Sequence, residues 1–228
     1  MNLFDNLGPV MVGPSSSHTA GAVRIGYISG KLLQDHVVKA EILLHGSFAT
    51  TGIGHGTDKA LIAGLLGMRP DDIRIPDSFF LAKKDGMEFS FSTITLKDAH
   101  PNTAVLRLTG EHGRKIEVQA ASIGGGRILI AKLDGIEVNF SAEKPTLIVH
   151  NVDQPGHVAE VTSMLSHKSV NIATMQLYRA GRGGHAVMVI EEFFIFSRSI
   201  SVPVFQITCI SSLFIFFPNN LYNSSCSC

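Results

Sequence analysis

Cysteine is nearly absent from this chain. Its 228 residues include three cysteines, Cys209, Cys226 and Cys228, which all lie among the last twenty residues. Residues 1–192 contain none, so this part holds neither a disulfide framework nor a metal site built from thiolates. The sequence therefore predicts no metal ligands in the body of this chain.

An excess of charge of one sign is missing as well. Nineteen Lys and Arg are balanced by nineteen Asp and Glu, and no run of basic residues is present, which argues against a nucleic-acid partner. Residues 1–5 lack the basic region of a signal peptide and no long apolar core follows, so we expect a cytoplasmic protein. A hydrophobic share of 45% with 17% charged residues is typical of a globular chain with one large or two modest domains.

Polar side chains are concentrated between Gly13 and Gly21. Residues 15–19 read Ser-Ser-Ser-His-Thr, and they stand just before an amphipathic pattern that predicts a helix over residues 19–33. The first N–H groups of a helix have no partner within it, and the helix dipole adds positive charge there. This segment would therefore hold a small carboxylate or phosphate beside an imidazole able to move a proton.

Residues 1–142 alternate between helix-like and strand-like patterns, which predicts a mixed α/β domain and the α+β fold class. A second helix is expected over residues 57–66, after the polar, glycine-rich segment 52–58. The two helix starts resemble each other, and we expect them to converge. The predicted strands of this domain are residues 40–45, 87–92, 104–109, 115–121 and 127–132.

A short linker at residues 143–145 precedes a second pattern. It predicts, in order, a strand at 146–152, a turn at 153–156, a helix at 157–168, and strands at 170–178 and 185–191. This order, β-α-β-β, opens a ferredoxin-like unit, which should continue with a second helix and a fourth strand. We assign residues 146–192 to this incomplete second domain.

Residues 193–228 form a tail of different composition, rich in Phe, Ile and Ser. Neither the expected helix nor the expected fourth strand is recognisable in it, so we interpret it as a foreign continuation outside both folds. Its uncharged run, 199–217, has the length of a membrane span. Pro203, Gln206 and the lack of a basic flank argue against a span, and we expect no membrane association.

Five short motifs resemble the β chains of bacterial iron–sulfur L-serine dehydratases, also called L-serine ammonia-lyases. In order along the chain they occupy residues 8–19, 45–52, 54–58, 100–103 and 122–126. The resemblance implies a substrate-binding-like domain followed by an ACT domain, a ferredoxin-like amino-acid sensor. It also implies a partner α chain that carries a [4Fe–4S] cluster, and loss of water from L-serine to give pyruvate and ammonia. The cysteine-free body of this chain agrees with that division.

The resemblance also suggests roles for individual residues. We take His18 as the general base or as the partner that positions it, since a catalytic base needs a pKa near the working pH. The alternative for His18 and the serines is simple helix capping. The candidate catalytic residues are His18, Ser17 and Thr19. The candidate substrate-binding residues are Ser15, Ser16, His45, Ser47, His55, Thr57 and Asp58. The candidate ACT ligands are Asp153, Pro155 and Gly156.

Several interpretations remain open at this point. Asp58 either orients His55 or His18, or compensates the dipole of the second helix. The triple glycine at residues 124–126 suggests a tight backbone passage near a ligand or partner, and His100 suggests turn structure. As a whole, the chain is predicted to be a lyase subunit. The alternatives are a non-catalytic regulatory module that binds an amino acid, and a protein tethered to a membrane through residues 199–217.

Overall fold

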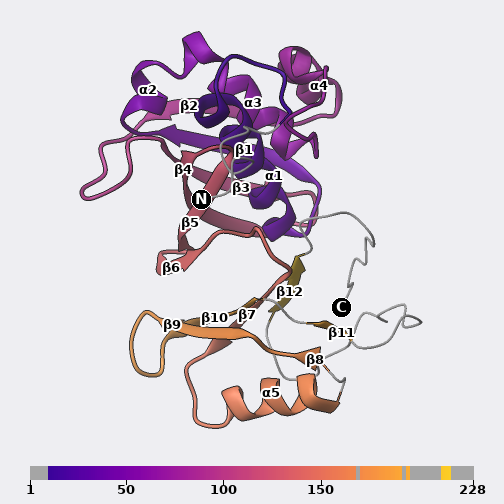
Figure 1. Ribbon diagram of the computed structural model, residues 1–228, viewed down its shortest axis with the longest axis vertical. Coiled ribbons are helices and arrows are strands. Elements are labelled where there is room, and N and C mark those ends of the chain that lie inside the picture. Colours follow the sequence, from indigo (N-terminus) through magenta and orange to yellow (C-terminus); the bar gives the residue numbers. More distant parts are fainter. Residues whose placement is uncertain (1–9, 168–169, 192–193, 196–211, 217–228) are drawn as a thin grey trace, which may run out of the picture. The chain divides into compact units, whose positions relative to one another are not determined.

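The computed structural model describes residues 10–167, 170–191, 194–195 and 212–216 (Figure 1). It divides into two compact units, one built on residues up to 134 together with 139–141, the other on 135–138 and the residues from 142 onward. Both units combine helices with β-sheets. The predicted α+β class is confirmed at this level, and the predicted boundaries at 142, 146 and 192 stay predictions.

A six-stranded sheet forms the base of the first unit, with strand order β2-β1-β3-β4-β5-β6. Strand β1 pairs in parallel with β2 and antiparallel with β3, and the β3–β4 and β4–β5 pairs are antiparallel. The strands are β1 (Val37–Leu44), β2 (Glu88–Thr93), β3 (Thr103–Gly110), β4 (Lys115–Gly124), β5 (Arg127–Leu133) and β6 (Ile136–Phe140). The sequence predicted five of them and missed β6, although the Asp134-Gly135 turn before it is a hairpin signal.

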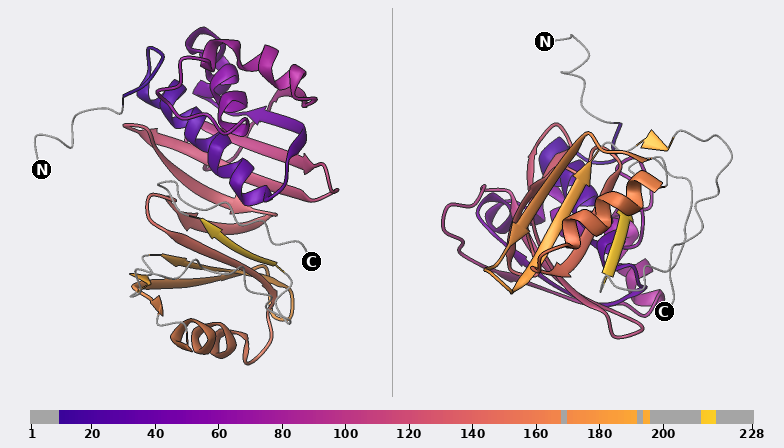
Figure 2. Two further views of the ribbon diagram at one scale, coloured as in Figure 1. Left: turned by 90° about the vertical axis from the view of Figure 1, so that its right-hand side faces the viewer. Right: turned by 90° about the horizontal axis from the view of Figure 1, so that it is seen from below.

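The helices of the first unit lie on one face of this sheet (Figure 2). They are α1 (Ala22–Leu33), α2 (Ser47–Thr50), α3 (Thr57–Leu65) and α4 (Ser78–Lys84), with 3₁₀ turns at Ile53–His55 and Ile75–Asp77. Both long helices and the sheet contribute buried side chains to the core. They are Ile25 and Ile28 of α1, Leu61 and Ile62 of α3, and Leu106, Ile128 and Ile130 of the sheet. Apolar burial of this kind is the main source of the stability of the unit.

The first predicted helix differs from the expectation at its start. Residues Ser16–Gly21 form a π-helical turn that leads into α1, three residues before the predicted start at Thr19. At Gly21 a Cβ atom would lie 2.1 Å from the Oγ of Ser122 on β4, so only glycine allows the turn to approach the sheet this closely. Short π-helical segments of this kind are frequent at functional sites.

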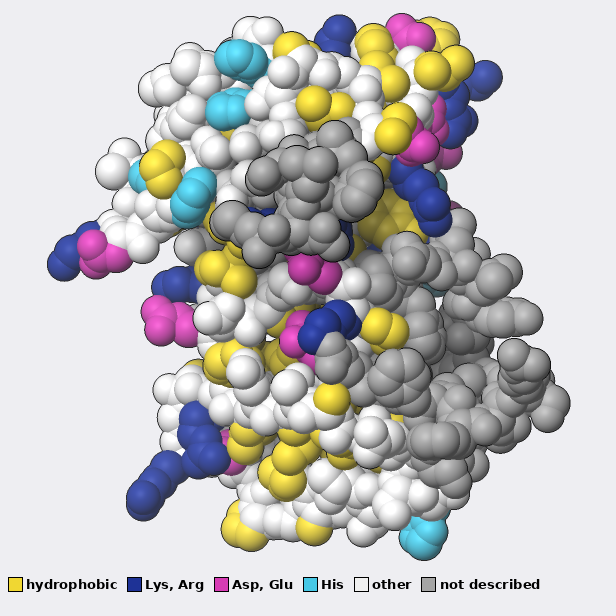
Figure 3. Space-filling model, in the orientation of Figure 1, with side chains coloured by type: hydrophobic (Ala, Val, Ile, Leu, Met, Phe, Trp, Pro, Cys, Tyr) yellow, Lys and Arg dark blue, Asp and Glu magenta, His cyan; other side chains and the backbone are white. Residues whose placement is uncertain are grey.

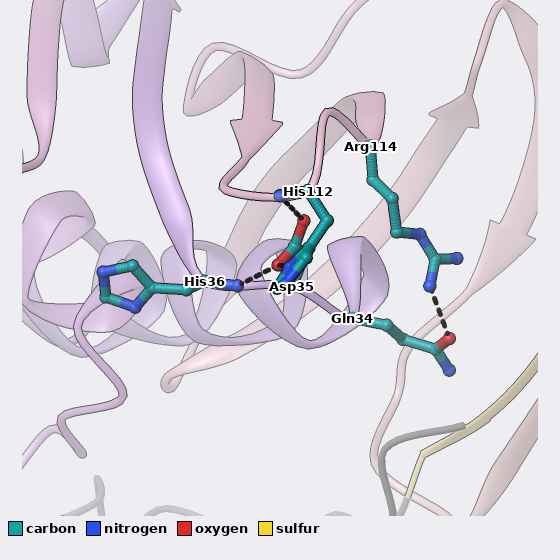
Figure 4. Close-up of polar contacts among 5 residues, drawn as sticks. All are labelled: Gln34, Asp35, His36, His112 and Arg114. Atoms are coloured by element: carbon teal, nitrogen blue, oxygen red, sulfur yellow. Dashed lines mark hydrogen bonds and ion pairs between the residues drawn. The ribbon is translucent and has the colours of Figure 1, made fainter. Parts of the chain in front are cut away.

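The loop after α1 is tied to the β3–β4 hairpin by a buried carboxylate (Figure 4). Asp35 accepts hydrogen bonds from the N–H groups of His36 and His112 and from Nδ1 of His112, each at 2.8 Å. Burial alone would raise the pKa of the Asp35 carboxyl, but the bonds from His112 and His36 outweigh it and lower that pKa. The same carboxylate raises the pKa of His112. Beside this pair, Arg114 donates to the side-chain oxygen of Gln34 at 3.3 Å.

The second unit is a four-stranded sheet with one helix packed against it. Its strand order is β12-β7-β10-β9, and all three pairings are antiparallel. Its elements are β7 (Thr146–Val152), α5 (His157–His167), β9 (Thr174–Arg179), β10 (His185–Glu191) and β12 (Ser212–Phe216). The predicted strand 170–178 is divided, because β8 (Val170–Asn171) pairs instead with β11 (Phe194–Ile195).

Helix α5 covers the sheet through a small apolar cluster. The buried members are Leu147, Val149, Val161, Leu165, Met188 and Ile190. They alternate along β7 and β10 and recur at positions 161 and 165 of α5, which is the pattern that places one face of each element in a common core. The β-α-β-β order predicted from residues 146–191 agrees with these elements.

The tail corrects one expectation. We expected no fourth strand, yet β12 pairs with the outer edge of β7, with Ser212 opposite His150 and Phe216 opposite Thr146. A run of Phe and Ile without alternation was hard to interpret as a strand, but backbone pairing does not require alternation. The expected second helix would fall in residues 196–211, outside the described residues, as does most of the membrane candidate 199–217. In the described part of the chain, no helix combines the length and apolar character needed to cross a membrane.

Candidate active site

His18 lies in the π-helical turn that begins the first helix. Ser15 is the cap of this turn: its Oγ accepts a hydrogen bond from the N–H of His18 at 3.1 Å, and its carbonyl accepts one from Thr19 at 2.9 Å. The serine at the cap therefore has the structural role considered in the sequence analysis. Ser16 and Ser17 are half-buried in the same turn.

Two hydroxyls of the α2 turn meet the imidazole of His18. Its Nε2 lies 3.1 Å from the Oγ of Ser47 and 3.2 Å from the Oγ1 of Thr51, and these two oxygens are 3.1 Å apart. Thr51 also donates to the carbonyl of Ser47 at 2.9 Å. Ser47 was among the predicted site residues and Thr51 was not. The i, i+4 spacing of the two hydroxyls, which places them on one side of a helical turn, was the available signal.

Aromatic rings enclose the same imidazole. The ring centroid of His18 lies 5.1 Å from that of His55 and 5.3 Å from that of buried Phe48. Burial lowers the pKa of His18 below its ordinary value, and the nearby His55 lowers it further, while a hydrogen bond that the ring donates to the backbone of Ser47 acts in the opposite direction. The lowered pKa favours the uncharged form of His18. Histidine side chains reach the surface of the first unit near α2 (Figure 3).

The two helix starts are linked by a reciprocal pair of hydrogen bonds. The Oγ1 of Thr57 donates to the carbonyl of His18 at 2.9 Å, and the Oγ1 of Thr19 donates to the carbonyl of His55 at 3.3 Å. Both threonines are buried, with exposed fractions of 0% and 3%. The expected convergence of the two starts is confirmed. The hydroxyl hydrogens of Thr19 and Thr57 are donated to these backbone carbonyls and so link the two helix starts.

The motif at residues 100–103 supports the α2 turn through its backbone. The carbonyl of Pro101 accepts from the N–H of Ser47 at 2.8 Å, and it lies 2.5 Å from where a Cβ on Gly46 would stand. Gly46 has a φ of +58°, a conformation that glycine adopts readily. The carbonyl of Asn102 accepts from the N–H of Ser122, which brings the motif at 122–126 to the same place. Motifs that are far apart in the sequence thus meet around His18.

Known proteins are similar to this chain in sequence. A family model described as serine dehydratase beta chain matches residues 3–84. The L-serine dehydratase beta chain of Peptoniphilus asaccharolyticus is 42% identical over 173 residues, which cover 75% of this chain and 78% of that protein. The chain belongs to the serine dehydratase beta chain family.

Two further relatives differ in how much of their own length is matched. The probable L-serine dehydratase beta chain of Bacillus subtilis is 40% identical over 190 residues, 83% of this chain and 86% of that protein. The D-3-phosphoglycerate dehydrogenase of the same organism is 26% identical over 171 residues, 75% of this chain but 32% of that protein. The resemblance drawn from the motifs is confirmed, and a related segment also occurs within a protein of another name.

Two other predicted site residues in this member of the serine dehydratase beta chain family have structural partners. His45, after the end of β1, accepts a hydrogen bond at Nδ1 from the N–H of Leu96 at 3.2 Å, and so supports the loop after β2. Asp58 accepts from the N–H of Lys59 at 2.8 Å in the first turn of α3. This is the geometry of the helix-start alternative, and within the described residues Asp58 contacts neither His18 nor His55.

The triple glycine of the family motif forms the tip of the β4–β5 hairpin. Gly124, Gly125 and Gly126 all have positive φ values, of 94°, 61° and 74°. Apart from their own chain neighbours, no atom of the described residues lies within 4 Å of a Cβ built on Gly124 or Gly125, so the described part of the chain leaves this tip open. The glycines are required here by backbone conformation.

The described residues offer no site for a metal cluster. Among them, no group of three or more His, Cys, Asp or Glu side chains has an arrangement able to hold a metal ion. The three cysteines, at positions 209, 226 and 228, lie outside the described residues. The part of this beta chain that is described therefore does not fit an iron–sulfur cluster.

The candidate ligand residues of the second unit surround the turn between β7 and α5. The Oδ2 of Asp153 lies 3.3 Å from an Nη1 of Arg179 at the end of β9, so this carboxylate is engaged in an ion pair that the sequence did not reveal. Pro155 is exposed, and Gly156 has a φ of +100° with open space around its Cβ position. The first turn of α5 is accessible at this point.

Proposed function

We propose that this chain is the β subunit of an L-serine dehydratase, a lyase that converts L-serine to pyruvate and ammonia together with a partner α chain. The observation that carries the proposal is the imidazole of His18, held by two hydroxyls beside the polar start of a helix. The names of the relatives, at 40% and 42% identity, support the same activity. We further propose a cytoplasmic location.

Binding of the substrate carboxylate falls to the π-helical turn. Ser15 is occupied with capping, while within the described residues no partner is found for the N–H groups of Ser16 and Ser17 at the first positions of the turn. Such N–H groups at a helix start bind carboxylates, and they stabilise the negative charge that spreads onto the carboxylate as the α proton leaves. Thr19 and Thr57 keep the two helix starts in register for this task.

Removal of the α proton falls to His18. The Cα–H bond breaks, the proton moves to the imidazole, and the electron pair forms the Cα–Cβ double bond as the bond from Cβ to the hydroxyl breaks. The protonated imidazole then returns this proton to the departing hydroxide, which leaves as water. The aminoacrylate product then takes up a proton to give an imine, and water adds to release ammonia and pyruvate. The lowered pKa of His18 suits this role, because it favours the unprotonated form that accepts the proton.

In this proposal the partner α chain, and not this chain, assists the departure of the β hydroxyl of serine. The resemblance assigns it to a [4Fe–4S] cluster on the α chain, where an open iron site would act as a Lewis acid. Following this resemblance, we assign the cluster to the α chain. The steps given above use only residues of this chain.

The test is anaerobic co-expression with a serine dehydratase α chain and an assay for pyruvate from L-serine. The change His18→Gln should lower turnover roughly 10²–10⁴-fold, the usual contribution of a general base, and leave serine affinity within a few-fold. His36→Gln, in the loop after α1, is the matched control and should behave as wild type. Full activity of the His18→Gln complex would exclude the catalytic role.

A second candidate is a non-catalytic module that binds an amino acid or small anion. The partial match to a D-3-phosphoglycerate dehydrogenase favours it, because a segment that recurs in differently named enzymes need not carry their chemistry. Such a module needs donors at residues 15–19 but no base. Serine binding without pyruvate formation in any complex with an α chain would support this candidate.

For the second unit we propose an ACT domain. The β12-β7-β10-β9 order with α5 on one face is what a ferredoxin-like unit has in its sheet, which supports the proposal. Gly156 offers an accessible backbone at the start of α5. Asp153 holds Arg179 and, in this arrangement, shapes the turn rather than contacting a ligand itself.

A further inference from the structure

The hydroxyl group of Thr51 has one hydrogen and three partners. Its Oγ1 lies 2.9 Å from the carbonyl oxygen of Ser47, 3.1 Å from the Oγ of Ser47 and 3.2 Å from Nε2 of His18. A carbonyl oxygen can only accept, so the hydrogen of Thr51 is donated there. Toward the other two partners, the Thr51 oxygen must accept.

The hydroxyl of Ser47 also has one hydrogen, shared between two contacts. It either points to Thr51 or to Nε2 of His18, which lies 3.1 Å away. If Nε2 carried no hydrogen, Ser47 could satisfy one of these contacts, and the contact between Nε2 and Thr51 would set two lone pairs against each other at 3.2 Å. Nothing in that arrangement would hold the three groups together.

A hydrogen on Nε2 resolves the arrangement. Nε2–H then donates to the two hydroxyl oxygens, Ser47 donates to Thr51, and Thr51 donates to the carbonyl of Ser47. Every contact contains a hydrogen. In a neutral imidazole a hydrogen on Nε2 leaves Nδ1 bare.

We infer that Ser47 and Thr51 hold His18 in its Nε2–H tautomer, so that Nδ1 is the atom that accepts the substrate proton. The tautomer follows from the hydrogen bonds alone, whereas the role of Nδ1 rests on the proposed function. Ser47 and Thr51 are positioning residues in this arrangement. Thr51 had no role in the sequence analysis.

Hydroxyl acceptors have a different effect from the carboxylate that orients many catalytic histidines. A carboxylate stabilises the imidazolium by its charge and raises the pKa of the histidine. Neutral oxygens orient the ring and select the tautomer without that charge. No carboxylate contacts the ring of His18 within the described residues, so the ring is oriented without a negative charge that would raise the pKa of His18.

The tautomer is measured by long-range ¹H–¹⁵N NMR on the full chain with ¹⁵N-labelled histidine, without the α chain. His18 is assigned by the signals that disappear in His18→Gln. We expect the wild-type Nε2 resonance at the position of a protonated nitrogen and the Nδ1 resonance at that of a bare one. An Nδ1–H tautomer in the wild type would overturn the inference.

The matched variants are Thr51→Val, Thr51→Ser and Thr50→Val. Thr50 makes the same kind of bond to the carbonyl four residues before it, Gly46, but does not contact His18. In Thr51→Val the two nitrogen resonances should move toward each other as the tautomers mix, and in the complex with an α chain kcat should fall roughly fivefold to tenfold, as expected for one neutral hydrogen bond. KM should stay within twofold.

Thr51→Ser should restore both the spectrum and kcat, and Thr50→Val should match the wild type. A fall in kcat with an unchanged Nε2–H spectrum would overturn the positioning role, as would Thr51→Val with wild-type values of both. If Thr51→Val does not fold, Ser47→Ala is the second variant, with the same expected mixing. A wild-type Nε2–H spectrum together with full turnover in His18→Gln would leave the tautomer standing and refute only the base role.

Discussion

At the scale of single residues, the chemistry of the site depends on what surrounds one imidazole. Hydroxyls of Ser47 and Thr51 contact one edge of His18, and His55 lies against its ring at 5.1 Å between centroids. Two imidazolium rings this close repel each other, so each proton makes the next one less favourable. His55 therefore adds to the lowering of the pKa of His18 that burial causes.

The change His55→Asn should raise the pKa of His18. Burial remains the larger cause of the lowered value, so we expect a partial return toward the ordinary histidine range. The measurement is an NMR titration of His18 in the full chain, with His36→Asn as the control that leaves the midpoint in place. In an active complex the acidic limb of kcat/KM would move to higher pH. A midpoint that stays unchanged or falls in His55→Asn would show that His55 has no such effect.

The sequence predicted which residues meet at the site better than it predicted what each does. His18, Ser47 and His55 were identified from motifs, and they do come together. Thr51 was missed because its contact depends on the fold of the α2 turn, which requires Gly46 at positive φ beneath the carbonyl of Pro101. That support comes from a segment about fifty residues away, and one sequence does not reveal such a contact.

At the scale of secondary-structure elements, α1 and α3 touch through glycines. A Cβ on Gly26 would lie 2.1 Å from the carbonyl oxygen of Leu61, and one on Gly64 would lie 2.0 Å from that of Val23. Backbones therefore approach with no side chain between them. This close approach holds the two helix starts, and with them His18 and His55, at the distance that the site needs.

Alanine at Gly26 should destabilise the chain by roughly 1–3 kcal/mol, the usual cost of overpacking. Gly30, one helical turn further along α1, is the matched control. There a Cβ would stand 3.5 Å from Leu65, an ordinary contact, so Gly30→Ala should leave the free energy of unfolding unchanged or raise it by about 0.5–1 kcal/mol through helix propensity. Denaturant midpoints of the full chain measure both. Equal effects of the two variants would contradict the close contact.

Helices were predicted correctly where the helical spacing of apolar residues continues over several turns. The prediction failed where contacts with other parts of the fold determine the local geometry. The bodies of α1, α3 and α5 follow from apolar spacing. The π-helical turn at Ser16–Gly21 does not, because it results from the contact of Gly21 with Ser122 on a strand that is formed a hundred residues later. The division of residues 170–178 into β8 and β9 likewise reflects pairing with different partners.

At the scale of the whole molecule, the two units differ in how their sheets are protected. The first unit has a six-stranded sheet with fully buried residues of α1 and α3 against one face. Among the described residues of the second unit, β9 is an edge strand whose residues are mostly exposed, and α5 contributes two buried residues, Val161 and Leu165. An open edge and a small core both favour local opening.

We therefore expect the second unit to be the less stable of the two. Limited proteolysis of the full chain should cleave after residue 142 first and leave a resistant fragment that ends near 142. A chain shortened to residue 195 lacks β12, which exposes the outer edge of β7, so it should be cleaved faster still and should self-associate in sedimentation experiments. Equal lifetimes of the two units would refute the order of stability. Removal of β12 leaves unpaired N–H and C=O groups along β7, which is why a change is expected. Unchanged behaviour of the shortened chain would show that β12 does not protect β7.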